Sequence, residues 1–574
     1  MKLPVHAWRT FWAYHAWAGI AVGLILHLMF VCGAVTLFLE PLKVWEEPVQ
    51  HRAARATTEA SPQALFERGL AAIKDLPAPP KRLYFGVPQG ETGVARFQYS
   101  DPKTGQWRAG WLDPAAGGAF VPEREQVATF LYHLHYLWHP ALPALEYLAG
   151  LLALAFLLTV ITGVLIHLKD LARQLTQFRP RAGRRVLWSD MHKVLGVMGL
   201  PFQILVCYTG ALLVLGPVLM TALSAPVFGN DSAAVSRIVW NEPAGLAAPG
   251  GPAPVRSLDD VLAIARAEVP GFHPIAFLIQ GYQREHGLVR AAGSIDGDGP
   301  LRYANVLIDQ STGAVLQVEM PSTDLASHAI RRWLSDIHFV YFGGTAVRVI
   351  LALLAMCGCA TILTGNWVWL ARRRARGARG RPHLLARLTA GAGAGSFVAL
   401  GALFVASRAL PFADPGRGAS EQLIFAGALA ACIAWAMVAR QAAATWWQQL
   451  GLAGLLLLSV PVWAARISPA GLLGGGPHLT TVVAVDAGIA IAGALLLAVA
   501  WAVRRALRRS ALMPASASEP VSAGDDADPD DAMPAIARSI EGAPEAATPV
   551  LARSIAADPE AAMPAIARSI EGAG

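Results

Sequence analysis

Long apolar stretches separated by polar segments dominate the hydrophobicity pattern of the chain. A hydrocarbon core of about 30 Å requires about 20 apolar residues in a helix. Stretches of about that length occur at 14–39, 142–168, 191–222, 341–370, 389–409, 420–440, 449–466 and 479–503. We therefore predict an all-α polytopic membrane protein with about eight transmembrane helices. The first stretch is too long for the apolar region of a signal peptide.

Two of the polar segments, 40–141 and 223–340, carry mixed helix and strand patterns. The pattern of the first segment predicts a helix at 64–74 and strands at 82–87, 94–99 and 110–112. The pattern of the second predicts a helix at 258–268 and strands at 274–279, 288–291, 303–308 and 314–319, with a hairpin turn at Gly313. Both segments read as small α+β modules between two spans, so the first four spans resemble a duplicated unit.

The domain organisation follows from these patterns. We expect seven parts: the N-terminus with the first span (1–39), a first module (40–141), spans two and three with their loop (142–222), a second module (223–340), span four (341–372), a basic loop with spans five to eight (373–509), and a disordered tail (510–574). The tail repeats a Pro-, Ala- and Arg-containing motif every 15 residues and is of low complexity.

Composition and charge agree with a membrane protein. Hydrophobic residues make up 54% of the chain and charged residues 15%, against about 25% charged residues in soluble domains. This excludes an ordinary soluble enzyme and a disordered regulator. The net charge of +7 arises from Lys and Arg clusters after spans two, four and eight. Since basic loops stay cytoplasmic, we predict cytoplasmic N- and C-termini and both modules on the outer side of the membrane; a nucleic-acid partner is not needed to explain the charge.

Other motifs are uninformative about catalysis. The five cysteines lie in apolar stretches and predict packing without a disulfide framework. The sequence has no dinucleotide fingerprint after a strand, no P-loop, no nucleophile elbow and no HExxH motif. If electrons move through this protein, their primary donor is another molecule.

Histidines carry the chemical signal, because they gather at the ends of the first four spans. His15, His167 and His192 lie at the cytoplasmic ends, whereas His133, His135, His139 and His338 lie at the outer ends. Ionisable residues within a membrane are rare and usually functional. Imidazoles at matched depth on different helices can clamp a flat macrocycle, so two layers predict two b-type haems and an electron path across the bilayer.

Three alternatives remain open at this point. Histidines at a membrane interface can simply reach water. His133, His135 and His139 could form a local metal site, and iron, copper or zinc could pass through a permease. The spans offer few carboxylates at mid-membrane depth, which weakens the permease reading. His27 lies 12 residues beyond His15 and is either a weaker ligand candidate or a buried histidine bonded to a helix carbonyl.

The order and spacing of several short segments are similar to a known family. These segments are His15-Ala-Trp-Ala-Gly19 with Gly23 and Gly33, Phe130-Leu-Tyr-His-Leu-His135-Tyr-Leu-Trp-His139-Pro140, Thr162-Gly163-Val-Leu-Ile-His167, Phe178-Arg179-Pro180, Asp190-Met-His192-Lys-Val-Leu-Gly196, Leu200-Pro201-Phe202, Tyr208-Thr209-Gly210, Asp336-Ile-His338, Gly343-Gly344 and Thr364-Gly365. Over residues 8–372 the chain resembles the PepSY-associated transmembrane (PiuB-like iron-regulated membrane protein) family, and most of all its di-haem inner-membrane siderophore reductases.

The resemblance implies particular cofactors and residues. It places the haem b ligands among His15, His167 and His192 at the inner face, and among His135, His139 and His338 at the outer face. Many relatives have a histidine where this chain has Gln203, and an aromatic residue where it has His27. Arg179, Arg184 and Arg185 could pair with haem propionates or serve as topology signals.

The resemblance also implies a function. The expected activity is reduction of a ferric siderophore or another Fe(III) chelate, with electrons from an unidentified donor. The alternative functions are a non-enzymatic scaffold or regulator whose PepSY-like modules bind partner proteins, and an iron-uptake permease.

Overall fold

The computed structural model of the chain describes residues 4–53, 60–88, 94–124, 126–168, 177–179, 184–235, 246, 248–296, 302–322, 326–375, 382–412, 414–467 and 480–512. Its long helices are α1 (Val5–Thr36), α6 (Leu145–His167), α9 (Leu200–Phe228), α13 (Gly344–Ala375), α14 (Pro382–Ala409), α15 (Arg417–Val438), α16 (Ala442–Ile467) and α17 (Thr480–Leu512). Within the described residues, these eight helices are long and apolar enough to cross a membrane. The predicted fold class is therefore confirmed.

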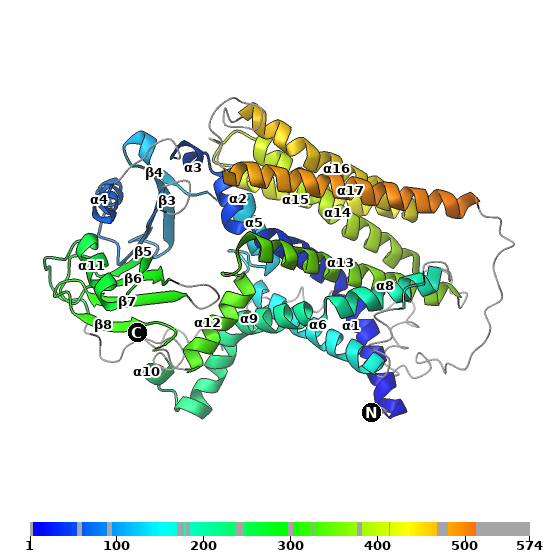
Figure 1. Cartoon of the computed structure of the whole chain (residues 1–574), viewed down its shortest axis with the longest axis horizontal. Helices are drawn as coiled ribbons and strands as arrows, with labels where there is room; N and C mark the ends of the chain where they lie inside the picture. Colours follow the sequence, from blue (N-terminus) through cyan, green and yellow to red (C-terminus); the bar gives the residue numbers. More distant parts are fainter. Residues whose placement is uncertain are drawn as a thin grey trace, which may run out of the picture.

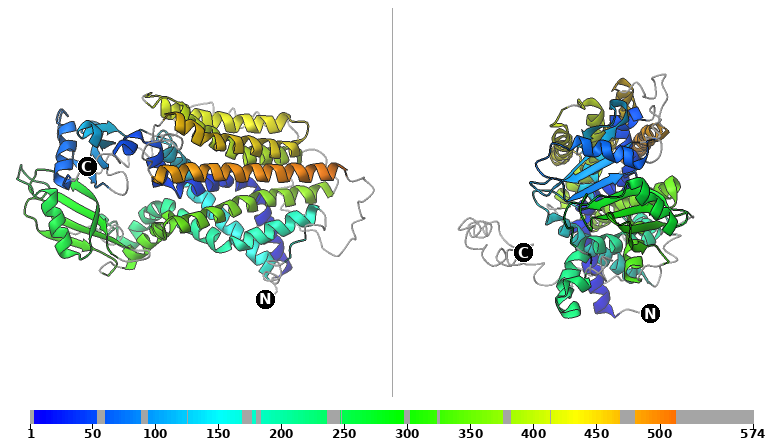
Figure 2. Two further views of the ribbon diagram at one scale, coloured as in Figure 1. Left: turned by 45° about the horizontal axis from the view of Figure 1, so that its top comes forward. Right: turned by 90° about the vertical axis from the view of Figure 1, so that its left-hand side faces the viewer.

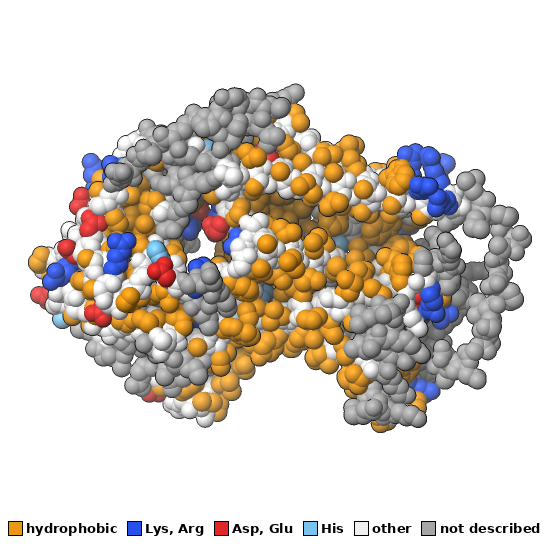
Figure 3. Space-filling view, in the orientation of Figure 1, with side chains coloured by type: hydrophobic (Ala, Val, Ile, Leu, Met, Phe, Trp, Pro, Cys, Tyr) orange, Lys and Arg blue, Asp and Glu red, His pale blue; other side chains and the backbone are white. Residues whose placement is uncertain are grey.

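The long helices form a bundle with a sheet at one end (Figure 1). Apolar side chains cover the bundle surface, and Lys and Arg gather at the end opposite the sheet (Figure 3). Below, this basic end is called the far end, and the other is called the sheet end. The shorter helices are α2 (Leu39–Glu46), α3 (Pro48–Ala53), α4 (Pro62–Ala72), α5 (Val127–His135), α8 (Arg184–Met198), α10 (Ser232–Val235), α11 (Leu258–Glu268), α12 (Ala326–Phe339) and the 3₁₀ turn η1 (Pro114–Ala116).

The third span differs from the pattern-based prediction. We expected one helix over 191–222, but the structure has α8 followed by α9, with Gly199 between them. Pro201 stands at the start of α9, where its missing N–H is not needed for helix hydrogen bonds. Gly229 ends α9 in a left-handed conformation, with φ of 59°. The membrane-length helix of this part is therefore Leu200–Phe228.

Helices α14 to α17 form a second layer against α1 and α13 (Figure 2). Buried polar side chains at the sheet end tie this layer to α2. The indole Nε1 of Trp45 donates to Oδ1 of Asp486, at 2.8 Å, and the Arg408 guanidinium lies over the same indole, 3.4 Å from the ring centroid. Trp45 is fully buried, so this contact replaces water for three polar groups.

The two predicted modules share one antiparallel sheet. Its strands are β1 (Arg82–Gly86), β2 (Ala95–Ser100), β3 (Trp107–Asp113), β4 (Ala119–Pro122), β5 (His273–Gln280), β6 (Leu288–Ser294), β7 (Tyr303–Asp309) and β8 (Val315–Glu319). Their order is β4-β3-β2-β1-β5-β6-β7-β8. The modules join where β1 pairs with β5, with Leu83 opposite Ile279 and Phe85 opposite Phe277. The sequence predicted neither this junction nor β4.

Helices α4 and α11 cover the buried face of the sheet. Phe66 of α4 and Val261 of α11 are fully buried and share one core with Phe85, Phe97 and Phe277. Ser61 and Ser257 cap the two helices, and Ser257 forms a capping box with Asp260. The two modules, which repeat the same order of helix and strands, thus share one hydrophobic core.

Side-chain hydrogen bonds connect the sheet to the helices below it. Glu319 of β8 accepts from Arg332 of α12, at 3.0 Å, and from Arg290 of β6, at 2.8 Å. In the first module, Gln126 precedes α5, and its amide donates to Glu47, at 3.1 Å. The sheet therefore contacts α12 directly, whereas α5 is joined to the segment between α2 and α3.

Candidate functional site

Four of the six candidate histidines lie in two pairs. At the far end, His15 of α1 faces His192 of α8, with ring centroids 6.0 Å apart and ring planes at 72°. At the sheet end, His135 of α5 faces His338 of α12, with centroids 6.3 Å apart and planes at 34°. Each pair therefore joins one histidine from the first half of the chain with one from the second.

The pairs lie at opposite ends of the helix bundle. His15 is on α1, and Gly33 of the same helix contacts His135. Eighteen residues separate these two positions, which is about 27 Å of helix rise. That distance is close to the thickness of a hydrocarbon core, about 30 Å.

Three of the four imidazoles are fixed through Nδ1 by a backbone carbonyl. Nδ1 of His15 lies 2.8 Å from the Thr159 oxygen, Nδ1 of His192 lies 2.9 Å from the Thr361 oxygen, and Nδ1 of His135 lies 2.8 Å from the Met29 oxygen. A carbonyl oxygen only accepts, so Nδ1 carries the proton in each ring. The other nitrogen, Nε2, therefore keeps its lone pair for a metal ion.

His338 reaches the same protonation state through a hydroxyl group. Its Nδ1 lies 2.9 Å from Oγ1 of Thr209. The Thr209 hydroxyl donates its single proton to the Leu205 carbonyl, at 2.7 Å, and this leaves its lone pairs to accept from Nδ1. All four rings thus present the same nitrogen.

A glycine on the neighbouring helix lies against each imidazole. A Cβ atom built on Gly163 would lie 2.9 Å from the His15 ring, and one on Gly365 would lie 3.1 Å from the His192 ring. The corresponding distances are 2.7 Å from Gly33 to His135 and 3.2 Å from Gly210 to His338. A side chain at these positions would meet the ring, so the glycines allow each histidine to lie flat on a helix backbone.

The contacts repeat between the two halves, and the repeat is visible in the sequence. Thr159-x-x-Thr162-Gly163 on α6 and Thr361-x-x-Thr364-Gly365 on α13 are the same motif, and each holds one far-end histidine. From the sequence, these glycines were expected only through the resemblance, and the hydrogen bonds to the carbonyls of Met29, Thr159 and Thr361 were not predicted. The repeated motif was the signal that could have found them.

The remaining histidines are outside the two ring pairs. His139 is exposed, and its Nδ1 accepts from the Ala141 N–H, at 3.2 Å. His167 is the last residue of α6 and lies near enough to His192 for the two imidazoles to interact electrostatically, but their rings do not form a pair. His133 stacks on Trp138, with centroids 4.3 Å apart. No three His, Cys, Asp or Glu side chains of the described residues converge to hold a metal ion, including His133, His135 and His139.

His27 and Gln203 both lie in the interior of the bundle. His27 is fully buried, and its Nε2 lies 3.1 Å from the Gly393 carbonyl and 3.2 Å from the Ser396 hydroxyl, both on α14. It therefore faces α14 and neither histidine pair. Gln203 is 2% exposed on α9.

The basic residues at the far end have specific partners. Arg179 forms a two-pronged ion pair with Asp190, with both N–O distances at 3.0 Å. These hydrogen bonds hold the pKa of Asp190 below its usual value, so it remains an anion that anchors the start of α8. Arg185 is exposed, and the side chain of Arg184 lies outside the described residues.

Two comparisons with known proteins place the chain. Residues 12–372 match the family described as the PepSY-associated TM region. A segment of 376 residues is 28% identical to the uncharacterized protein PA4219 of Pseudomonas aeruginosa, covering 62% of this chain and 91% of that protein. The matched residues contain both histidine pairs and the whole sheet, and they end before α14. The chain belongs to the PepSY-associated transmembrane family, as a multi-pass membrane protein with four further helices.

Proposed function

We propose that the protein is a membrane electron carrier that binds two b-type haems, one between His15 and His192 and one between His135 and His338. The observation that carries this proposal is the geometry of the two pairs. Two imidazole nitrogens that are each about 2 Å from one metal ion have ring centroids about 6 Å apart. The spacings of 6.0 and 6.3 Å fit this arrangement.

The residues around each pair fit a planar macrocycle. Each pair supplies only two protein ligands, so four further ligands have to come from another molecule, as a porphyrin provides. The lone pairs of Nε2 are free because Nδ1 is bonded in every ring. The bare glycine backbones beside the rings set the ring orientation. This selects His15, His192, His135 and His338 and leaves His167 and His139 without a ligand role.

The ligand set favours electron transfer over oxygen chemistry. Bound haem would supply reversible one-electron chemistry. His15 with His192, and His135 with His338, would hold a haem from both faces, and such a haem would have no position left for oxygen or substrate. The helix contacts at Nδ1 raise the basicity of the ligands and fix their orientation, which limits rearrangement when charge changes. The chain thus holds two redox sites at opposite ends of one helix.

Orientation and localisation are part of the proposal. Helices α13 and α17 end at the far end (Figure 1), and their last turns carry basic residues, among them Arg373, Arg504 and Arg505. Since basic segments remain cytoplasmic, the sheet faces the periplasm of a bacterial inner membrane. Reporter domains fused after Arg376 test this: an alkaline phosphatase fusion should be inactive and a green fluorescent protein fusion fluorescent.

The proposed acceptor is a ferric siderophore or similar Fe(III) chelate at the sheet end. One electron converts Fe(III) to Fe(II), which binds hard oxygen ligands more weakly and is released. The electron donor acts at the far end and is a separate molecule, because no motif for a flavin or nicotinamide was found in the sequence. Support for the iron chemistry comes from the resemblance and from the direction of the proposed electron path.

The decisive experiment is spectroscopic. Purified protein from haem-replete cells should show sharp reduced α-bands and close to two haems per chain by pyridine haemochrome. His15→Ala, His192→Ala, His135→Ala and His338→Ala should each remove one haem, whereas His139→Ala and His167→Ala should retain both. A colourless protein would overturn the proposal and favour the PepSY scaffold.

The acceptor is tested separately by stopped flow. Dithionite-reduced protein, freed of excess reductant, should be reoxidised by a ferric hydroxamate chelate. The Ga(III) form of the same chelate should have no effect, because Ga(III) accepts no electron. Haem without reoxidation by any ferric chelate would retain the electron carrier and reject the iron substrate.

A further inference from the structure

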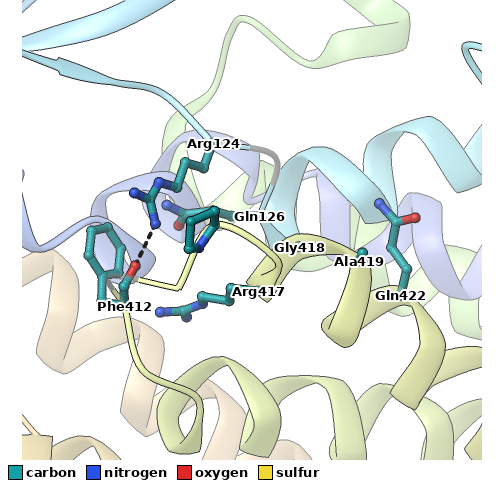
Figure 4. A pocket seen from close by; sticks show the side chains of 8 residues that line it. Arg124, Gln126, Phe412, Arg417, Gly418, Ala419 and Gln422 are labelled. Atoms are coloured by element: carbon teal, nitrogen blue, oxygen red, sulfur yellow. Dashed lines mark hydrogen bonds between the residues drawn. The ribbon is translucent and has the colours of Figure 1, made fainter.

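A pocket of about 300 Å³ lies where the four additional helices meet the family region. Arg124 and Gln126, which precede α5, form one side, and Phe412, Arg417, Gly418 and Gln422 of the α14–α15 connection and α15 form the other (Figure 4). The pocket does not include either histidine pair. It lies at the sheet end of two membrane-length helices, which is the level of lipid head groups.

Several groups at the pocket are hydrogen-bond donors. The Arg124 guanidinium donates to the carbonyls of Phe412 and Asp414, at 2.9 and 3.1 Å, and among the described residues it forms no ion pair. Gly418 and Ala419, in the first turn of α15, also line the pocket. The N–H groups of a first helical turn have no partner within the helix and favour a negatively charged ligand.

The pocket also contains a hydrogen-bond acceptor that has no partner among the described residues. Gln126 is 5% exposed, and its Oε1 has no hydrogen-bond partner in the described part of the chain, although its Nε2 is bonded to Glu47. A buried amide oxygen without a donor destabilises the fold, because it has lost its hydrogen bond to water. Gln126 lines the pocket, so a ligand with its own N–H or O–H could relieve this cost.

The charge of the pocket is close to balanced. Arg417 is 5% exposed and forms an ion pair with Glu421, at 2.9 Å, and it also donates to Ser407. Asp414 is exposed and precedes Pro415, which lines the pocket, and one of its carboxylate oxygens accepts from the Gly416 N–H. Arg124 and Arg417 are thus offset by nearby carboxylates. A zwitterion suits this balance better than a multiply charged anion.

We propose that this pocket binds the phosphoethanolamine head group of a membrane lipid. The phosphate would accept from Arg124 and from the α15 N–H groups, and the ammonium would donate to Oε1 of Gln126. The pocket would thus recognise a phosphate group that also carries a hydrogen-bond donor. Free phosphate in its protonated form has the same two features. The volume is at the lower limit of ligand pockets, so a bulky ferric chelate does not fit.

The proposed site gives the additional helices a specific connection to the family region. Gln126 is the residue before α5, and α5 ends at His135. A head group bridging α15 and Gln126 would hold the two parts together at that helix start. This inference does not depend on haem binding, because its readouts are lipid occupancy and thermal stability.

The test uses the full chain in nanodiscs that differ only in the lipid amine. Phosphatidylethanolamine offers N–H donors, whereas phosphatidylcholine, with a trimethylated amine, offers none. We expect native mass spectrometry of mixed-lipid samples to show phosphatidylethanolamine retained about tenfold more than phosphatidylcholine, the ratio expected if one hydrogen bond is worth about one factor of ten. The unfolding midpoint should be higher in phosphatidylethanolamine. Equal retention and equal midpoints would overturn the proposal.

Variants and free ions separate the remaining outcomes. Arg124→Gln should remove a phosphate contact that both lipids need, so neither lipid should be retained at the site and the preference should be lost. Because Arg124 is exposed, the variant should fold. Arg284→Gln is the matched control: Arg284 is also exposed and bonded to a carbonyl, that of Gly250, but lies in the sheet module, and it should keep the preference. If inorganic phosphate added to phosphatidylcholine nanodiscs raises the midpoint as much as phosphatidylethanolamine does, and does so only with Arg124 present, the ligand is the free ion and the lipid assignment is wrong.

Discussion

Gly163 of α6 and His15 of α1 are packed so closely that a methyl group on the glycine would lie 2.9 Å from Cε1 of the imidazole. The same imidazole is bonded to Thr159, one turn earlier on α6. The ring is therefore held by a hydrogen bond at one edge and by bare backbone beneath it. Its orientation is set by α6 and not by its own helix.

The variant Gly163→Ala should displace His15 and remove the far-end haem. Overpacking of this kind usually lowers the free energy of unfolding by about 1 to 3 kcal/mol. The clash is relieved only if the His15 imidazole leaves its position. We expect haem content to fall from close to two to close to one per chain in the pyridine haemochrome assay. Gly216→Ala is the control, since a Cβ atom there meets nothing within 4 Å; a Gly163→Ala protein with full haem content would show that the close contact is unimportant.

Thr209 is expected to tune the sheet-end haem. Replacing Thr209 by Val keeps the shape but removes the acceptor for Nδ1 of His338. A ligand that has lost this bond is less basic, so the midpoint potential of that haem should rise while the other stays constant. Thr209→Ser should restore the original value in a potentiometric titration. An unchanged potential in the Val variant would mean that the hydroxyl does not act on the ligand.

Glu46 should make stability depend on pH near neutrality. It lies on α2, outside the eight spans, and accepts from the Ala128 N–H, at 3.1 Å. Burial raises the pKa of Glu46 to about 8; the Ala128 N–H and Arg408 oppose the rise, and Glu421 and Glu47 add to it. The folded state therefore binds a proton that the unfolded chain releases above its ordinary pKa of 4.5, so stability should fall between pH 4.5 and 8.

Glu46→Gln tests this dependence, because the amide keeps a carbonyl acceptor but does not titrate. The unfolding midpoint of the variant should vary less between pH 5 and 8 than that of the parent protein. Glu40→Gln provides the comparison: this residue is on the same helix, with a side chain 73% exposed. If the two variants and the parent show the same pH profile, Glu46 does not carry the proton.

Asp309 should have the opposite pH dependence in the sheet. Burial favours its protonated form, but hydrogen bonds from Ser311, Thr312 and His286 outweigh burial and lower the pKa of Asp309 to about 2. The ordinary value is 3.8, so its ionised form contributes about 2 kcal/mol. This contribution is fully present above about pH 4 and is lost as the pH falls towards 2.

The corresponding measurement is hydrogen exchange of the β7–β8 hairpin. Asp309→Asn should accelerate exchange at pH 7, and the difference from the parent protein should shrink as the pH approaches 3. Asp296→Asn is a matched control, because Asp296 also bonds a histidine, His273, but with a side chain 76% exposed. Exposed pairs contribute little. Equal acceleration in both variants would show that the buried hydrogen bonds of Asp309 contribute no more than the exposed pair of Asp296 and His273.

Much of the fold was readable from the sequence because a bilayer imposes a length on every span. The apolar stretches predicted all eight membrane-length helices, and alternation predicted seven of the strands. The break at Gly199 was missed, because apolarity continues across it. The pairing of β1 with β5 was also missed, since nothing within either strand specifies a partner so distant in the chain.

The candidate site was predicted only in outline. Position along the spans placed seven histidines at two levels, but it could not rank them, because a residue at a helix end can face either water or a neighbouring helix. The structure separates His135 from His139 through one contact, the bond from His135 to Met29. That bond depends on the packing of α5 against α1, which a local pattern does not encode.

The pairing of β1 with β5 also has a consequence for biogenesis. About 190 residues, including the two spans α6 and α9, separate these strands in the chain. At about 5 to 20 residues per second, the ribosome adds them in about 10 to 40 s. During that interval β1 remains an open sheet edge, available to other chains. A chaperone that shields exposed strands should therefore be needed before synthesis of β5, and not after it.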